Sequence, residues 1–249
     1  IRNAISLSSA QYVAIQGAGD ISLPARLRKQ YEILSGDRNI SVVGSYYKNF
    51  KVSDDSEVES DIVESPQFPD FSYCLKKNPF SHGEVMFSRS AYEEVGGYRE
   101  FFKFAQDRDL WLRMSQKNFN FMVIQEVLYF RRNFRKDGVS TDLDKALHQI
   151  MLSEIAVKDA VFRHKFGISF VDETGPLSYL FRPRNLRTTK LLIGAAMISK
   201  IKRDDAKFRT MSRLALDEGF LAKVLYFVLI KMRVVDLLMV SKSRYDFDV

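Results

Sequence analysis

Cysteine and long uncharged apolar runs are both scarce in this chain, and each scarcity excludes a class of protein. Cys74 is the single cysteine among 249 residues, so the chain cannot form an internal disulfide, which favours a reducing compartment. The long apolar stretch at residues 220–240 is interrupted by Lys223, Lys231, Arg233 and Asp236. A membrane-spanning helix needs about 20 mostly uncharged residues. We therefore predict no spanning helix, and leave open an amphipathic helix on a bilayer surface or a helical cap on the main domain.

An excess of charge of one sign is absent from most of the chain. Of the formal net charge of +7, residues 181–249 carry 15 Lys and Arg against 7 Asp and Glu, a net of +8. The first 180 residues therefore have 23 basic and 24 acidic side chains, a net of −1. A basic tail suits a polyanionic neighbour. Because its charges alternate with aliphatic runs and few aromatic rings are available for base stacking, we expect lipid head groups and no nucleic acid.

The hydrophobic pattern predicts an α/β fold with flanking helices and a helical C-terminal region. We expect short strands at residues 11–16, 40–44, 85–87 and 121–130, and helices at residues 25–34, 91–95 and 107–116. In the first helix, Leu27, Tyr31 and Leu34 are spaced to share one apolar face. Residues 51–64 are rich in acids and serine and are expected to form an exposed loop. Beyond residue 140 almost the whole chain reads as helix, interrupted near Pro176 and Pro183.

The stretch from Gly96-Gly-Tyr98 to Gln106-Asp-Arg-Asp-Leu-Trp-Leu-Arg113 is the most informative part of the sequence. Asp107 and Asp109 lie at a predicted helix start, where unpaired backbone N–H groups favour carboxylates. Two interpretations follow from the residues alone. Both aspartates can be helix caps, or one of them can be a general base that faces a cleft and takes a proton from an attacking hydroxyl.

A second candidate is the turn Gln16-Gly-Ala-Gly-Asp20, which follows the first predicted strand. Its two glycines permit a close approach of backbone to a ligand. Asp20 could hold a cation, because magnesium is often bound by one or two carboxylates with substrate phosphates completing its shell. A plain turn is the competing interpretation.

Taken together, five segments in this order resemble family 2 glycosyltransferases, over residues 1 to about 135. The segments are Ile1-Arg-Asn3, Gly17-Ala-Gly-Asp20 with Pro24, Ser81-His-Gly-Glu-Val-Met-Phe87, Gly96-Gly-Tyr98, and Gln106-Asp-Arg-Asp-Leu-Trp-Leu-Arg113. The resemblance implies part of a GT-A (nucleotide-diphospho-sugar transferase-like) fold. It implies inverting transfer of a sugar from a nucleotide-diphosphate donor to a hydroxyl of a saccharide or lipid-linked acceptor.

The resemblance also implies roles for individual residues. Asp107 would be the base that deprotonates the acceptor, and Arg2, Asn3 and Asp20 would lie beside the donor. The residues implied near substrate are His82, Trp111 and Arg113. Asp20 would contact a Mg²⁺ or Mn²⁺ ion at the leaving diphosphate. His82 could equally be a structural, hydrogen-bonded histidine, while Trp111 and Arg113 could instead support the helix that carries the base.

The resemblance also implies a domain organisation, a biological role and a cellular location. We expect residues 1–135 to be the C-terminal portion of a GT-A domain and residues 136–249 a basic helical extension. The expected role is in cell-surface polysaccharide synthesis, on the cytoplasmic face of the plasma membrane, with peripheral contact through the basic helices. The alternative is a catalytically degenerate module of the same type that binds sugar or scaffolds a partner.

Two departures from the family pattern bear on these expectations. The family's Asp-x-Asp-Asp turn here has glycine at its first and third positions, Gly17 and Gly19, and keeps only Asp20. The strand–helix units that hold the nucleotide in the family would precede Ile1. We therefore expect the chain to be truncated or completed by a partner, since a parallel sheet without its first strands would expose edges.

Overall fold

The computed structural model describes residues 1–53, 56–132 and 143–227, and it divides into two compact units, Ile1–Phe181 and Arg182–Val249. The predicted boundary between residues 135 and 136 lies outside the described residues. The strands of the first unit are β1 (Tyr12–Ala14), β2 (Ile21–Ser22), β3 (Ile40–Ser53), β4 (Ser56–Val63), β5 (Met86–Ser88) and β6 (Asn120–Arg132). Its helices are α1 (Arg2–Ser6), α2 (Arg26–Gly36), α3 (Phe71–Lys76), η1 (His82–Glu84), α4 (Arg89–Glu94), α5 (Gln106–Gln116), α6 (Leu143–Phe166), α7 (Phe170–Thr174) and η2 (Gly175–Phe181). These elements confirm the predicted α/β class.

The strands form one mixed sheet in the order β1-β5-β3-β6-β2, with β4 paired to β3. Only the β3–β6 pair is parallel among the described strands, and the other pairs are antiparallel. The expectation of a parallel sheet is therefore wrong for most of these strands. The prediction of a loop at residues 51–64 is also wrong, because β3 continues to Ser53 and β4 pairs with it through the backbone. Such pairing needs no apolar side chains, and edge strands commonly carry charge.

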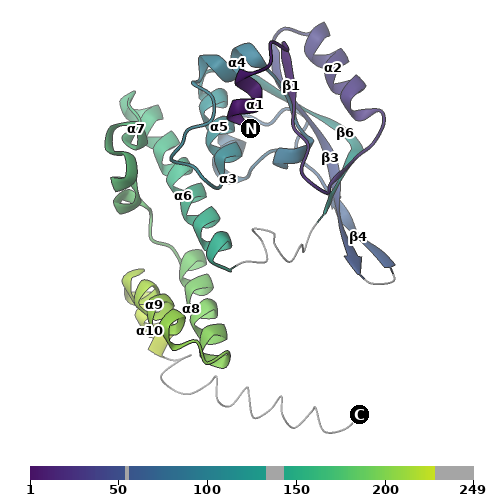
Figure 1. Ribbon diagram of the computed structural model, residues 1–249. Helices are drawn as coiled ribbons and strands as arrows, with labels where there is room; N and C mark the ends of the chain where they lie inside the picture. The colour runs from purple at the N-terminus through teal and green to yellow at the C-terminus, as the bar shows by residue number, and fades with distance from the viewer. Residues whose placement is uncertain (54–55, 133–142, 228–249) are drawn as a thin grey trace. The chain divides into compact units, whose positions relative to one another are not determined.

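Both faces of the sheet are covered, α2 lying on one side and α3, α4 and α5 on the other (Figure 1). The two-residue period of a strand sends neighbouring side chains to opposite faces. Val42 and Phe87 accordingly belong to the core beneath α5, while their neighbours Val43 and Met86 belong to the smaller core beneath α2. The centre of the sheet is therefore buried on both sides.

Helix α2 packs on the sheet with a polar face, contrary to the predicted apolar one. Of the three residues expected on that face, only Leu34 is buried, and Leu27 and Tyr31 are 47% and 54% exposed. The buried positions are taken instead by Arg26 and Gln30, which are 2% and 0% exposed. A polar face can be buried when it forms hydrogen bonds, and the Arg26 guanidinium and the Gln30 side-chain nitrogen do so here.

Arg26 and Gln30 bind backbone oxygens of the sheet and of its turns. The Arg26 guanidinium donates to the carbonyls of Ile15 (3.1 Å) and Gly83 (2.9 Å). The Gln30 amide donates to the carbonyls of Val43 (3.1 Å) and Glu84 (2.6 Å). Helix α2 is thus attached to the loops at one end of the sheet by side-chain hydrogen bonds.

The second unit, as far as it is described, consists of helices. These are α8 (Leu186–Ile201), α9 (Asp205–Asp217) and α10 (Phe220–Tyr226). Their small core is lined mainly by alanine and aliphatic residues, including Leu192, Ile193, Ala196 and Ala215, which confirms the predicted helical character of this region. The predicted long amphipathic helix at residues 220–240 lies mostly outside the described residues. Within the described part of the chain, no helix has the length and apolar character needed to cross a membrane.

We predict that Arg26→Lys lowers the free energy of unfolding by about 2 kcal/mol, because a lysine cannot reach both carbonyls and each buried acceptor left unpaired costs about 1–3 kcal/mol. Urea denaturation followed by the fluorescence of Trp111, the single tryptophan, measures this. Arg28→Lys is the matched control, since Arg28 lies on the same helix with a side chain that is 72% exposed. Equal stabilities of the two variants would contradict the assignment.

Candidate functional site

The turn at residues 17–20 is held against the end of β6 by hydrogen bonds to Asp20. The Tyr129 hydroxyl donates to Asp20 Oδ2 (2.6 Å) and accepts from the Gly17 N–H (2.9 Å). The Arg132 N–H donates to Asp20 Oδ1 (2.8 Å). Burial, together with the hydrogen bond to Asp20, raises the pKa of the Tyr129 phenol, so this donor stays protonated at neutral pH. Asp20 therefore has a defined orientation.

A second turn, which contains η1, packs directly against the first. A Cβ atom added at Gly83 would lie 2.3 Å from Tyr129 Oη and 3.0 Å from the Gly17 nitrogen. Glycine is needed here because any side chain would separate the two turns. The contact brings His82 next to the turn that carries Asp20.

The buried carboxylate of Glu84 organises this second turn from within. Glu84 is 1% exposed and accepts hydrogen bonds from the backbone N–H groups of Ser81 (3.0 Å) and Ser45 (3.1 Å). Burial raises the pKa of Glu84 to about 8, although these hydrogen bonds and the nearby Arg26 act in the opposite direction. Glu84 is thus a structural acid beneath His82.

Asp107 lies in the first turn of α5, close to His82 and Tyr98. Asp107 Oδ2 accepts a hydrogen bond from Asn78 Nδ2 (2.7 Å), and His82 Nε2 is 2.7 Å from Tyr98 Oη. Burial lowers the pKa of His82, and the negative charge of Asp107 opposes that shift. Burial and the same charge raise the pKa of Tyr98. A carboxylate, an imidazole and a phenol from three sequence motifs are therefore clustered, and the first two were predicted site residues.

Arg2 and Asn3 also lie near the start of α5. They line a pocket of about 340 Å³ together with Tyr98, Glu100 and Gln106, the residue before Asp107. The Arg2 guanidinium forms an ion pair with Glu100 (2.5 Å). The structure thus places two predicted donor residues beside the segment that carries the predicted base.

Asp109, two residues further along α5, has a different environment. It is 1% exposed and ion-paired with Arg99 and with Arg113 (2.8 Å). Burial alone would raise the pKa of Asp109, but the two guanidinium groups hold it below its usual value. The interpretation of both aspartates as helix caps is therefore not supported, since Asp109 binds arginines and Asp107 binds Asn78.

The N-cap position of α5 is Ala105, which provides no side-chain cap and has a left-handed backbone with φ of 55°. This conformation is costly for a residue with a Cβ atom. Ala105 is 8% exposed and belongs to the main core, so tertiary packing maintains the turn that leads into Asp107.

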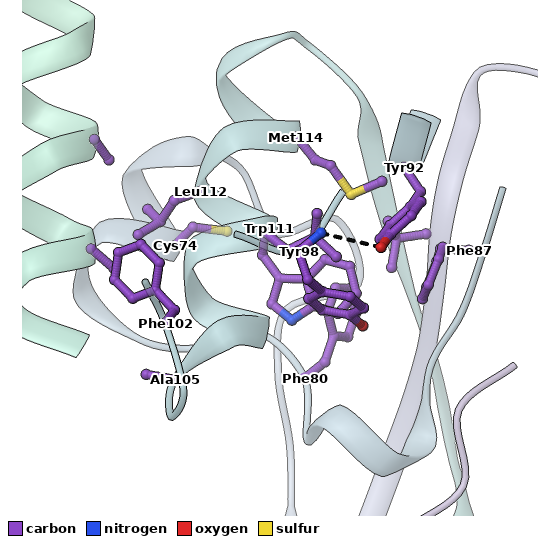
Figure 2. Packing of buried hydrophobic residues seen from close by; sticks show 14 of the residues in the cluster. Cys74, Phe80, Phe87, Tyr92, Tyr98, Phe102, Ala105, Trp111, Leu112 and Met114 are labelled. Atoms are coloured by element: carbon purple, nitrogen blue, oxygen red, sulfur yellow. Dashed lines mark hydrogen bonds between the residues drawn. The ribbon is translucent and has the colours of Figure 1, made fainter. Parts of the chain in front are cut away.

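Trp111 and Arg113 do not face a substrate surface in this structure, which corrects their predicted role in substrate binding. Trp111 is fully buried among aromatic rings, with Phe80 at 5.6 Å and Phe87 at 6.0 Å between centroids (Figure 2). Arg113 is 7% exposed and donates to the carbonyl of Gly97 (2.6 Å) as well as to Asp109. Both side chains anchor α5, because its inward face points into the core.

Sequence reasoning missed three residues that shape the site. Asn78 and Tyr129 gave no signal in the sequence, because an isolated asparagine or a strand tyrosine has many ordinary roles. Tyr98 lay within a recognised motif, but its contact with His82 depends on the fold.

The residues of the described chain do not by themselves form a metal site. No group of three or more His, Cys, Asp or Glu side chains in residues 1–53, 56–132 and 143–227 is placed to hold an ion. Both oxygens of Asp20 already accept hydrogen bonds. A single carboxylate of this kind would depend on substrate phosphates to complete a cation's shell.

Comparisons with known proteins support the resemblance seen in the sequence. No protein-family model matches the chain. It is 31% identical over 153 residues to a protein of Bacillus subtilis (strain 168) named "Putative glycosyltransferase EpsE", covering 59% of this chain and 54% of that protein. It is 25% identical over 144 residues to "Uncharacterized glycosyltransferase MJ1057" of Methanocaldococcus jannaschii, covering 57% and 49% respectively. The chain thus spans about half the length of these relatives, and its similarity to glycosyltransferases is confirmed.

Two solved structures are weakly similar in fold. S. aureus TarS 1-349 in complex with UDP-GlcNAc has a TM-score of 0.46 at 10% identity, covering 84% of this chain and 68% of that one. The mannosyltransferase PcManGT from Pyrobaculum calidifontis, in complex with GDP-Man and Mn²⁺, has a TM-score of 0.44 at 14% identity, covering 99% and 66%.

We predict that Glu84 makes the free energy of unfolding fall as pH rises from about 4.5 to 8, by up to about 1.4 kcal/mol per pH unit. The sign follows from the raised pKa, because the folded protein binds a proton in this window that the unfolded chain has lost. Below about 6.5 the lowered pKa of His82 acts in the opposite direction, so the fall is clearest above that value. Urea denaturation at several pH values measures the slope. Glu84→Gln should remove this contribution, whereas the exposed Glu93→Gln should not. An unchanged slope in Glu84→Gln would contradict the prediction.

Proposed function

We propose that the chain is the acceptor-side portion of an inverting family 2 glycosyltransferase in which Asp107 is the catalytic base. The observation that carries the proposal is the cluster of Asp107, His82 and Tyr98 beside the pocket lined by Arg2 and Asn3. Sequence similarity to two glycosyltransferases supports the class of reaction. We also propose that the donor is a nucleotide-diphosphate sugar, that the acceptor is a saccharide or lipid-linked hydroxyl, and that transfer inverts the anomeric carbon.

In the proposed reaction, Asp107 accepts the proton of an acceptor hydroxyl as that oxygen attacks the anomeric carbon of the donor sugar. The bond between this carbon and the diphosphate oxygen breaks, and the nucleoside diphosphate leaves with the bonding electron pair. The hydrogen bond from Asn78 orients the carboxylate through Oδ2, and we assign Oδ1 to the acceptor. A side chain in this position contributes by proton transfer and by orientation.

His82 and Tyr98 are proposed to position the sugar rather than to transfer its proton. Because burial lowers the pKa of His82, its imidazole is neutral at pH 7 and can exchange hydrogen bonds with sugar hydroxyls. Tyr98 fixes the ring through the 2.7 Å contact to Nε2. A purely structural role for His82 remains the competing interpretation, and the position of the ring beside Asp107 favours the substrate role.

On the donor side, we propose that Arg2 and Asn3 lie beside the nucleotide and that Asp20 lies beside the diphosphate. Mg²⁺ or Mn²⁺ at Asp20 belongs to this part of the proposal, with the diphosphate oxygens supplying most of the ligands. Such an ion would act as a Lewis acid for the leaving group. The turn of residues 17–20 is ordered by Tyr129 and Gly83, which suits a binding role.

The proposed biological setting is cell-surface polysaccharide synthesis at the cytoplasmic face of the plasma membrane. The net charge of +8 in residues 181–249 supports peripheral contact with anionic lipids, each basic residue near such a surface contributing about 1 kcal/mol. A degenerate sugar-binding module is the second candidate. It is favoured by Gly17, Gly19 and the occupied oxygens of Asp20.

We predict that Asp107→Asn lowers turnover about a thousandfold, within the range of a lost general base, and leaves the free energy of unfolding nearly unchanged. Nucleotide release from a panel of nucleotide sugars by the full-length protein measures turnover, with and without Mg²⁺ or Mn²⁺. A cation response that Asp20→Asn weakens would assign Asp20 to the metal. Sugar-nucleotide binding without turnover would favour the degenerate module, and turnover indifferent to Asp107→Asn would require another base.

Asp109→Asn is expected to behave in the opposite way, because Asp109 is a buried partner of two arginines. Removing one member of a buried ion pair costs about 3–5 kcal/mol, so this variant should be strongly destabilised in urea, whereas Asp107→Asn should not be. A stable but inactive Asp109→Asn protein would contradict the division of roles between the two aspartates.

A further inference from the structure

A larger pocket, of about 730 Å³, lies next to the proposed site and takes no part in the chemistry described so far. Its walls are mainly apolar and are formed by Phe101, Phe104, Leu152, Pro176 and Tyr179. Pockets of this volume with apolar walls and a few polar groups are typical ligand sites. All of these residues belong to the first compact unit.

Aromatic rings give the pocket its shape. The rings of Phe101 and Tyr179 are 5.4 Å apart between centroids, and Phe104 stacks on His148 at 6.4 Å. Phe101 also contacts the buried Phe102 at 5.0 Å. Loop residues 100–104 therefore form a wall of the pocket and are fixed to the core at the same time.

The same loop connects this pocket with the proposed catalytic residues. Glu100 lines both the 730 Å³ pocket and the 340 Å³ pocket that contains Arg2 and Gln106. Gln106 directly precedes Asp107. The two pockets therefore share Glu100, and the smaller one extends to the residue before Asp107.

Another part of the wall comes from the short helix η2, which also carries exposed apolar side chains. Leu177 is 62% exposed, Leu180 is 80% exposed and Phe181 is 43% exposed. Contiguous exposed apolar groups mark sites of contact with apolar partners.

We propose that the 730 Å³ pocket binds the hydrocarbon portion of an amphipathic acceptor whose sugar hydroxyl reaches Asp107. The proposal rests on the proposed transferase function and narrows its acceptor to a glycolipid-type molecule. A saccharide alone would leave the apolar walls in contact with water, whereas a hydrocarbon chain covers them with a favourable free energy. Lys103 and His148 are also part of the lining and suit the polar linkage between chain and sugar.

The test measures the binding of alkyl β-D-glucosides with methyl, hexyl and octyl chains to the 249-residue chain by calorimetry, below the critical micelle concentrations. Complete burial of one methylene group changes affinity roughly fourfold. Because this pocket is partly open, each methylene is buried incompletely. We therefore expect the affinity for the glucosides to rise at least about threefold for each added pair of methylenes. Equal affinities for the methyl and octyl compounds would overturn the proposal.

Two wall variants and a matched control separate the pocket from general detergent binding. Phe101→Ala and Tyr179→Ala should reduce the preference for octyl over methyl glucoside at least about fivefold, because each removes a ring from the wall. Tyr31→Ala should leave it unchanged, since Tyr31 is similarly exposed but lies on α2. Urea denaturation verifies that each variant is folded. A preference that survives both wall substitutions would place the hydrocarbon elsewhere and overturn the proposal.

Failure of this proposal can be distinguished from failure of the proposed function. If Asp107→Asn loses turnover but glucoside affinity does not depend on alkyl chain length, the proposed transferase function stands and the apolar acceptor pocket is rejected. Binding that depends on chain length without turnover would retain the pocket as a lipid site and reject the catalytic role.

Discussion

The rest of the site depends on the ion pairs that the buried carboxylate of Asp109 forms with two arginines. This carboxylate lies between Arg99 and Arg113, and Arg99 also reaches Asp159 on α6. Buried charges persist only where they are paired and hydrogen-bonded. Because these pairs join α5, α6 and the loop after α4, they determine where the first turn of α5 lies. Asp107 takes its position from this network, although it makes none of its ion pairs.

A second polar connection has the same effect at the end of the sheet. Arg26 joins the carbonyls of Ile15 and Gly83, and Gly83 in turn packs on the turn of Asp20. The cation also lies 5.0 Å from the centroid of the Tyr129 ring, an arrangement that is favourable for a guanidinium. Two loops far apart in the sequence are therefore held together by one side chain from α2. Both connections are polar, and both are buried.

These polar connections explain which features could be predicted from the sequence. The strands at residues 40–44 and 121–130 and the helix at residues 107–116 were predicted correctly in type, because their apolar residues follow the period of the element. The face of α2 was predicted wrongly because Arg26 and Gln30 look like surface residues until their acceptors are known. The acidic strand β4 was missed for a related reason, as backbone pairing leaves no apolar pattern. Among site residues, Asp107 and His82 were singled out by their motifs, but the contact of Tyr98 with His82 and the burial of Trp111 and Arg113 depend on the fold.

The left-handed backbone at Ala105 affects which amino-acid substitutions in this protein would change its activity. The left-handed conformation of Ala105 is unfavourable for an isolated chain and is maintained only by the residues packed around it. The orientation of Asp107 therefore depends on the packing of the core and not on the local backbone preference. Substitutions that loosen this core would then disable the site without touching any residue in it. Natural variants with altered activity should accordingly be found in the aromatic interior as often as around the carboxylate itself.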